Sequence, residues 1–377
     1  MAAIPSRKSS REAMDARRYV NLPNPFPMWR GGVLYEARIA YESWGELSPA
    51  RDNAILLFTG LSPSAHAASS PEDPSEGWWE RMIGPGRPID TDRYFVVCVN
   101  SLGSCFGSTG PASTNPATGA PYRLSFPDLS IEDIARAGYE TMRALGVERL
   151  DTVIGPSLGG MVVMAYAAQF PGAARRLISI SGTAAASPFA IALRSIQRDA
   201  IMSDPAWQGG QYPVGQPPRA GMRLARKLGM VTYRSAAEWR ERFGRAPVDP
   251  EKRRDGPFAP EFAIQAYLEA HADRFVRNFD ANCYLYLSRA MDRFDLGAHG
   301  SSHAQALARG QLEQALVIGV ESDLLFPISE QRALAQALEE AGVRTRFAAL
   351  PCLEGHDSFL IDIERFGAEI GSFLRGD

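Results

Sequence analysis

Residues 150–171 read LDTVIGPSLGGMVVMAYAAQFP and combine an apolar run, a glycine-rich turn and a second apolar run. The first run, 150–155, predicts a buried strand, and the second, from about 159 to 170, predicts a helix that ends at Pro171. The turn between them has the form G-x-S-x-G, which forces the serine into a strained backbone conformation and exposes its hydroxyl at the edge of a sheet. We therefore predict that Ser157 is a nucleophile.

Strands and helices alternate on both sides of this stretch. Apolar runs that predict strands cover residues 37–44, 53–60, 94–100, 177–181, 315–320 and 344–350, and helical patterns cover 131–145, 329–341 and 357–374. Parallel strands joined by helices imply right-handed crossovers. The sequence therefore predicts an α/β fold with a mostly parallel, doubly wound sheet.

The alternation stops between residues 185 and 310, where the composition is helical and no convincing apolar strand occurs. We expect this stretch to be a helical lid inserted into an α/β core formed by residues 23–184 and 311–377. Residues 1–22 are polar and rich in Arg and Ser, which predicts a flexible N-terminal tail.

The composition excludes several kinds of partner and site. Lys and Arg total 40 against 43 Asp and Glu, so the chain lacks the basic excess of proteins that bind nucleic acids or anionic membranes. No apolar stretch has the length of a membrane helix or resembles a secretory signal. The four cysteines are too scattered for a metal site or a disulfide framework. We expect a cytoplasmic protein that acts on small molecules without a metal.

A nucleophilic serine needs a histidine as base and a carboxylate that orients the histidine. On a fold with this strand-to-helix turn, the acid and then the histidine follow the serine along the chain. Asp323 comes just after the strand 315–320, with Glu321 as the alternative acid, and His356 follows the strand 344–350. The other histidines do not have this position: His66, His271, His299 and His303.

An oxyanion hole requires two backbone N–H donors that point at the developing charge. The amide of Leu158, directly after the nucleophile, is one candidate. The amide of Leu61, in the loop after the strand 53–60, is the second, although the segment Gly-Leu-Ser-Pro there could be a simple turn.

Several further motifs resemble the homoserine O-acyltransferases of the α/β-hydrolase fold and their serine O-succinyltransferase relatives. The resemblance extends from about residue 25 to residue 374. Its motifs are Asn-Ser-Leu-Gly at 100–103, Gly-Ser-Thr-Gly-Pro at 107–111, the segment 155–161, Gln-Arg at 197–198, Ala-Arg at 225–226, Thr-Tyr-Arg-Ser at 232–235, Asp323 and Gly-His-Asp at 355–357.

The resemblance implies that Ser157, Asp323 and His356 are the catalytic residues. It also implies that Arg226 holds the carboxylate of an amino-acid substrate, that Asp357 binds the amino group and that Tyr233 contributes to the same site. An arginine fork fits a carboxylate, and an aspartate offers an ammonium group its counter-charge. The alternatives are an ion pair within the lid for Arg226 and a helix N-terminal acid for Asp357.

Two features bear on the choice of substrates. Gly60, Leu61, Ser62 and Pro63 resemble the branch of the family that uses serine. Arg194 stands where members that use acetyl groups usually carry an uncharged residue, and a positive charge facing the acyl pocket would favour the carboxylate of a succinyl group. The alternative for Arg194 is a solvent-facing arginine on a helix.

These features together predict ping-pong transfer of a succinyl group from succinyl-CoA, the co-substrate, to the hydroxyl of L-serine, a step toward cysteine, without a resident cofactor. Acetyl or succinyl transfer to homoserine is the alternative within the family. A plain esterase or thioesterase is the alternative outside it, because water and an alcohol can attack the same acyl-enzyme; a non-catalytic binding protein is a more distant one. The resemblance also implies a homodimer.

Overall fold

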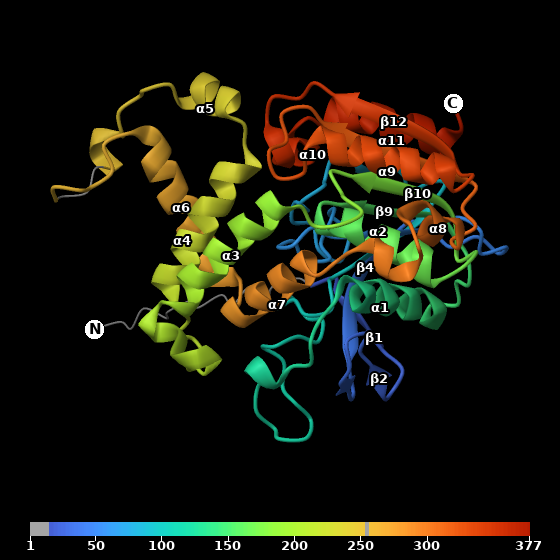
Figure 1. Ribbon diagram of the computed structural model, residues 1–377, viewed down its shortest axis with the longest axis horizontal. Helices are drawn as coiled ribbons and strands as arrows, with labels where there is room; N and C mark the ends of the chain where they lie inside the picture. Colours follow the sequence, from blue (N-terminus) through green and yellow to red (C-terminus); the bar gives the residue numbers. More distant parts are fainter. Residues whose placement is uncertain (1–14, 253–255) are drawn as a thin grey trace, which may run out of the picture.

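A computed structural model describes residues 15–252 and 256–377 and contains a central sheet of eight strands (Figure 1). Across the sheet the strands run β1 (Arg18–Asn21), β4 (Arg38–Trp44), β8 (Phe95–Val99), β5 (Ala54–Phe58), β9 (Leu150–Pro156), β10 (Ala174–Ile180), β11 (Gln314–Val320) and β12 (Arg344–Leu350). The pairs from β8 to β12 are parallel, whereas β4 is antiparallel to both of its neighbours. The predicted mostly parallel α/β sheet is confirmed.

Helices cover both faces of the sheet. On one face α1 (Ile131–Ala144), α2 (Leu158–Gln169) and α9 (Ile328–Glu340) share a hydrophobic core with alternate residues of the strands, such as Leu56 of β5. On the other face α11 (Ile363–Arg375) packs on the remaining strand residues, such as Leu57. Burial on both faces explains why the central strands are continuous apolar runs in the sequence.

The chain between β10 and β11 is helical. It contains α3 (Pro188–Met202), α4 (Arg219–Tyr233), α5 (Ala236–Phe243), α6 (Ala263–Asn278), α7 (Ala281–Asp292) and α8 (His303–Ala308). Helices α3 to α7 lie together on the left of Figure 1, beside the sheet, whereas α8 packs against α2 and α9. The end of the predicted insertion therefore lies on the core.

Two expectations about the chain ends need correction. Residues 18–21, assigned to a flexible tail, form edge strand β1, which pairs with β4; residues 1–14 lie outside the described part of the chain. The closing helix is broken at Asp362 into α10 (Ser358–Ile361) and α11, because Asp362 has a non-helical ψ of 61° and its side chain caps the amide of Arg365. Strand β1 and the break at Asp362 both depend on polar residues, so no apolar pattern in the sequence reveals them.

The remaining elements are short. Two pairs of two-residue strands form small sheets: β2 (Phe26–Pro27) with β3 (Val33–Leu34), and β6 (Ile83–Gly84) with β7 (Ile89–Asp90). The 3-10 turns are η1 (Arg123–Ser125), η2 (Pro205–Gly210), η3 (Pro250–Lys252), η4 (Leu296–His299) and η5 (Gly355–Asp357). Across residues 15–252 and 256–377, every helix is too short or too polar to cross a bilayer.

Candidate active site

The turn between β9 and α2 holds Ser157 in a conformation that few residues other than glycine adopt, with φ 57° and ψ −117°. The two flanking positions must be glycine because a side chain would not fit there. A Cβ on Gly155 would lie 2.1 Å from the carbonyl oxygen of Gly159, and a Cβ on Gly159 would lie 2.8 Å from the carbonyl oxygen of Phe58. This crowding explains the G-x-S-x-G pattern and places the hydroxyl of Ser157 at the carboxyl end of the sheet.

The structure brings together the three residues predicted from the sequence. The Nε2 atom of His356 lies 2.8 Å from the Oγ atom of Ser157, and its Nδ1 atom lies 2.7 Å from Oδ2 of Asp323. The other carboxylate oxygen of Asp323 accepts hydrogen bonds from the backbone amides of Leu325 and Phe326, both at 2.9 Å. Asp323 is therefore fixed by the loop after β11 and orients the imidazole toward the serine.

The environment of His356 makes it a stronger base. Burial lowers the pKa of His356, but the charge of Asp323 and its hydrogen bond outweigh burial, so the pKa lies above its usual value. The ring also stacks on Phe326, with ring centroids 4.9 Å apart. His356 is thus held by a carboxylate on its edge and by an aromatic ring on its face.

The alternatives for the acid and the base lie elsewhere. Glu321 is exposed, and its amide continues the pairing of β11 with the carbonyl of Leu350. His66 is paired with Glu42, and the remaining histidines have other partners: His299 pairs with Glu132, His303 pairs with Asp295, and the ring of His271 packs at a tilt against that of Tyr267.

The predicted oxyanion donors lie next to the serine. Leu158 is the first residue of α2, and a Cβ on the neighbouring loop residue Gly60 would lie 3.9 Å from the Cβ of Ser157. Within residues 15–252 and 256–377, neither the amide of Leu158 nor that of Leu61 donates to another backbone group. Both amides are therefore free to donate hydrogen bonds to an oxyanion that forms beside Ser157.

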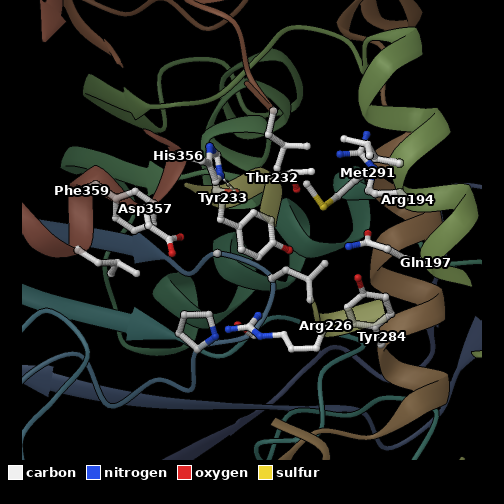
Figure 2. A pocket seen from close by; sticks show the side chains of 18 residues that line it. Arg194, Gln197, Arg226, Thr232, Tyr233, Tyr284, Met291, His356, Asp357 and Phe359 are labelled. Atoms are coloured by element: carbon white, nitrogen blue, oxygen red, sulfur yellow. Dashed lines mark hydrogen bonds between the residues drawn. The ribbon is translucent and has the colours of Figure 1, made fainter. Parts of the chain in front are cut away.

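One pocket joins the sheet to the lid helices (Figure 2). The core contributes Ser157, His356, Asp357 and the loop residues Gly60, Leu61, Ser62 and Pro63. The lid contributes polar and aromatic side chains from α3, α4 and α7: Arg194, Gln197, Arg226, Thr232, Tyr233 and Tyr284. Ser157 and His356 therefore share one pocket with the predicted substrate-binding side chains, whereas Asp323 contacts His356 and does not line the pocket.

Arg194 is buried in this pocket, so the alternative of a solvent-facing arginine is wrong. Its Nε atom donates to Asp292 of α7, which also pairs with Arg198. Among the described residues, no hydrogen-bond partner faces either terminal nitrogen of Arg194. An unpartnered, buried guanidinium edge is a costly feature that an anionic ligand would satisfy.

The residues that the resemblance assigned to an amino-acid substrate lie around Tyr233 (Figure 2). The guanidinium of Arg226 lies 4.7 Å from the ring centre of Phe275 and 5.8 Å from that of Tyr233, and no described carboxylate pairs with it. Asp357 accepts a hydrogen bond from Nε of Arg234 at 3.2 Å and keeps its other oxygen available. The lid ion pair considered for Arg226 is therefore absent from the described residues.

The sequence reasoning did not assign a site role to Gln197, Thr232 or Tyr284. The carboxamide of Gln197 donates to the backbone of α4, and a Cβ on Gly229 would lie 2.9 Å from it and 3.1 Å from the hydroxyl of Tyr233. Gln197 and Thr232 lie within the motifs that carry the family resemblance, so the sequence did contain a signal for these two residues. Tyr284 lies on a buried face of α7 with nothing in its local sequence to separate it from a core residue.

Three potential metal ligands, Cys352, Glu354 and Asp362, lie close together after β12. Burial and the hydrogen bond to Asp362 raise the pKa of Cys352 to about 12, so the thiol is neutral at physiological pH and donates to that carboxylate. Asp362 also pairs with Arg365. The contacts within the chain therefore account for this cluster, and a neutral thiol is a poor metal ligand.

Comparison with known proteins adds the family. Residues 53–352 match the family model of the alpha/beta hydrolase fold. The chain is 57% identical to a protein of Litchfieldella anticariensis named serine O-succinyltransferase, over 96% of this chain and 98% of that protein. This chain belongs to the homoserine O-acyltransferase family of α/β hydrolases. The resemblance inferred from the motifs is confirmed.

Other members of the homoserine O-acyltransferase family differ in their names. A protein of Streptomyces lavendulae named L-serine/homoserine O-acetyltransferase is also 57% identical, over 95% of this chain and 97% of that protein. The crystal structure of homoserine O-acetyltransferase from Bacillus anthracis superposes with a TM-score of 0.86 at 27% identity, covering 96% of this chain and 98% of that one. Overall identity within the family therefore does not separate acetyl from succinyl transfer.

Proposed function

We propose that the protein transfers a succinyl group from succinyl-CoA to the hydroxyl of L-serine through an acyl-enzyme on Ser157. The relatives' names support an O-acyltransferase that acts on serine. The observation that carries the choice of succinyl is the buried guanidinium of Arg194, whose two terminal nitrogens lack partners among the described residues and which lines the same pocket as Ser157.

In the first half of the reaction His356 accepts the proton of Ser157 through Nε2, and the serine oxygen attacks the thioester carbonyl. The amides of Leu158 and Leu61 stabilise the oxyanion. When the intermediate collapses, the carbon–sulfur bond breaks and His356 returns the proton to the departing thiolate of CoA. Asp323 stabilises the imidazolium in between.

In the second half L-serine occupies the pocket with its carboxylate on Arg226 and its ammonium on Asp357. His356 takes the proton from the substrate hydroxyl, which attacks the acyl-enzyme and forms O-succinyl-L-serine while Ser157 regains its proton. Each of the three charges that distinguish these substrates then meets an opposite charge: two carboxylates on Arg194 and Arg226, and one ammonium on Asp357.

The experiment that tests this proposal measures CoA release with succinyl-CoA and acetyl-CoA, each with serine and with homoserine. We expect the highest kcat/KM with succinyl-CoA and serine. Arg194→Leu should lower kcat/KM for succinyl-CoA about 10- to 100-fold, because a charge-assisted hydrogen bond contributes about 1.5–3 kcal/mol, and should leave transfer from acetyl-CoA unchanged. Arg194→Lys, which keeps the charge, is the control. An unchanged donor preference in Arg194→Leu would refute the role of this residue.

Hydrolysis is the competing reaction on this fold. A transferase should release CoA faster when serine is added, whereas an esterase or thioesterase should be indifferent to serine. The names of the relatives that are 57% identical to this chain favour transfer. The cytoplasmic location, the homodimer and the lack of a resident cofactor stay predictions.

A further inference from the structure

Arg234 and Ser235 connect α4 to α5 in the lid, directly after the pocket residue Tyr233. Their backbone approaches the loop of His356 closely, because a Cβ on Gly355 would lie 3.0 Å from the amide nitrogen of Ser235 and 3.1 Å from the carbonyl carbon of Arg234. Gly355 also has a φ of 69°, which favours glycine. The lid and the loop of the catalytic histidine are therefore in direct contact here.

The hydroxyl of Ser235 fixes this junction. Its Oγ atom donates to the carbonyl oxygen of Leu353 and, as the N-cap of α5, accepts from the amide of Glu238 at 3.0 Å. One hydroxyl thus joins the first turn of α5 to the chain just before the catalytic histidine. Because the two backbones are held together, the side chain of Arg234 starts from a fixed position relative to Asp357.

The guanidinium of Arg234 lies between two carboxylates. Its Nε atom lies 3.2 Å from Oδ2 of Asp357, and its Nη1 atom lies 3.3 Å from Oε1 of Glu238. The Glu238 side chain is 9% exposed and that of Arg234 is 14% exposed, whereas that of Asp357 is 25% exposed. A planar fork between two partners restricts the orientation of each. Glu238 therefore anchors Arg234, and Arg234 fixes the more exposed carboxylate of Asp357.

Arg234 and the catalytic groups line different pockets. Asp357 lines the pocket of Ser157, whereas Arg234 lines a neighbouring pocket together with Glu238 and Arg242. Since Oδ2 of Asp357 is occupied by Arg234, Oδ1 is the oxygen left for a ligand in the pocket of Ser157. These contacts place the influence of Arg234 on a bound amino acid through Asp357.

We infer that Arg234 is a positioning residue for Asp357 and turns one oxygen of that carboxylate toward the ammonium group of the acceptor amino acid. This inference rests on the proposed function, in which Asp357 binds the ammonium. The charge of Arg234 would by itself repel an ammonium, but Glu238 pairs with the same guanidinium and offsets this repulsion. A carboxylate that is already oriented favours the acceptor because less freedom is lost on binding.

The test measures the two halves of the reaction separately in Arg234→Met. Acylation by succinyl-CoA alone, followed as the burst of CoA release, should be unchanged, because Asp357 meets only the acceptor. The kcat/KM for L-serine should fall about tenfold, the low end of what a charge-assisted hydrogen bond contributes. The kcat/KM for 3-hydroxypropionate, which is serine without its ammonium group, should be unchanged.

Arg242→Met is the matched control and should resemble the wild type in all three measurements. Arg242 pairs with the same carboxylate oxygen of Glu238 and, among the described residues, forms no ion pair with Asp357. Arg234→Lys keeps the charge but lacks the fork, so it should lose nearly as much activity toward L-serine as Arg234→Met. It takes the place of Arg234→Met in every comparison if that variant fails to fold.

A double variant tests whether Arg234 acts through Asp357. Asp357→Asn alone should lower kcat/KM for L-serine about 100-fold, and Arg234→Met added to it should cause no further loss.

Slower acylation, an unchanged or increased kcat/KM for L-serine, an equal loss with 3-hydroxypropionate, or additive losses in the double variant would overturn the inference. A wild type that releases CoA equally fast with and without L-serine would instead refute the proposed function.

Discussion

Three histidines of this protein face a buried carboxylate, and they differ in what lies beside the ring nitrogen that the carboxylate leaves free. His356 has Asp323 on Nδ1 and the hydroxyl of Ser157 on Nε2. His66 has Glu42 on Nδ1, and both the carbonyl oxygen and the hydroxyl of Ser75 lie beside its Nε2, at 3.0 and 3.1 Å. His299 faces Glu132 through Nε2, at 3.3 Å.

The partner of the second nitrogen decides what each pair can do. A hydroxyl can give up its proton to Nε2, so His356 can act as a base. The hydroxyl beside His66 belongs to Ser75, which donates to Asp73 and whose own carbonyl oxygen also lies against Nε2, so this contact ties one part of the loop to another. The environment of the carboxylate differs as well, because Asp323 is also held by two backbone amides. Burial and a carboxylate are therefore insufficient to identify a catalytic histidine.

We expect the largest effect on catalysis from Asp323→Asn, which changes the partner of Nδ1 of His356. The two backbone amides should keep the amide oxygen of the asparagine, which turns its NH2 group toward Nδ1 of His356. The imidazole is then forced to carry its hydrogen on Nε2, facing Ser157, and cannot accept the proton. We expect kcat to fall about 10⁴-fold with little change in stability, measured as CoA release and as thermal unfolding. A loss of less than about tenfold would contradict the orienting role of Asp323.

The pH dependence sharpens the contrast between His356 and His66. His356 must be neutral to act as a base, so activity is present above its pKa and is lost as pH falls through it. Because Asp323 raises this pKa above the usual value, the acid limb should lie above about pH 6.5 and fall about tenfold per pH unit. Pre-steady-state acylation by succinyl-CoA measures it. The limb should persist in Glu42→Gln, and its disappearance there would show that the two pairs are not independent.

The smallest effect on catalysis is expected at the third pair. Burial raises the pKa of Glu132, but the hydrogen bonds from His299, from the backbone and from Ser130, together with the charge of His299, outweigh burial and lower the pKa overall. His299→Ala leaves this carboxylate buried without its partner and should lower the free energy of unfolding by about 3 kcal/mol at pH 7. Because a lowered carboxylate pKa stabilises the fold above that pKa, this difference should shrink as pH falls through it. Urea unfolding measures the loss, and a changed kcat per folded molecule would contradict the purely structural role.

The parts of the fold that the sequence predicted are those with strong local patterns. Strand β12 has the predicted bounds, and β9 and α2 differ from prediction by one residue at some ends. These elements are buried on two faces or end at glycine and proline, so their boundaries are visible in the chain. Edge strand β1 has one buried residue, Val20, among three exposed ones, and the break at Asp362 depends on a cap, so neither has an apolar signal.

The candidate site likewise contains some features that the sequence predicted and others that only the structure revealed. Ser157 was predictable because the crowding at Gly155 and Gly159 restricts the residue types there. The Glu42–His66 contact was not, because its partners are 24 positions apart and meet only through the sheet. The burial of Arg194 also needed the structure, since the sequence of α3 gives no sign of which of its arginines, Arg194 or Arg198, lines the pocket.

The residues proposed to carry out the reaction and the residues proposed to bind charged substrate groups come from different segments of the chain. Ser157, Asp323 and His356 lie on turns at the carboxyl edge of the sheet, whereas Arg194 and Arg226 lie on α3 and α4. Substitutions on these helices can therefore alter the choice of donor or acceptor without disturbing the groups that break and form bonds. Such a division lets specificity change in a few steps, and two relatives with the same identity to this chain carry different acyl groups in their names.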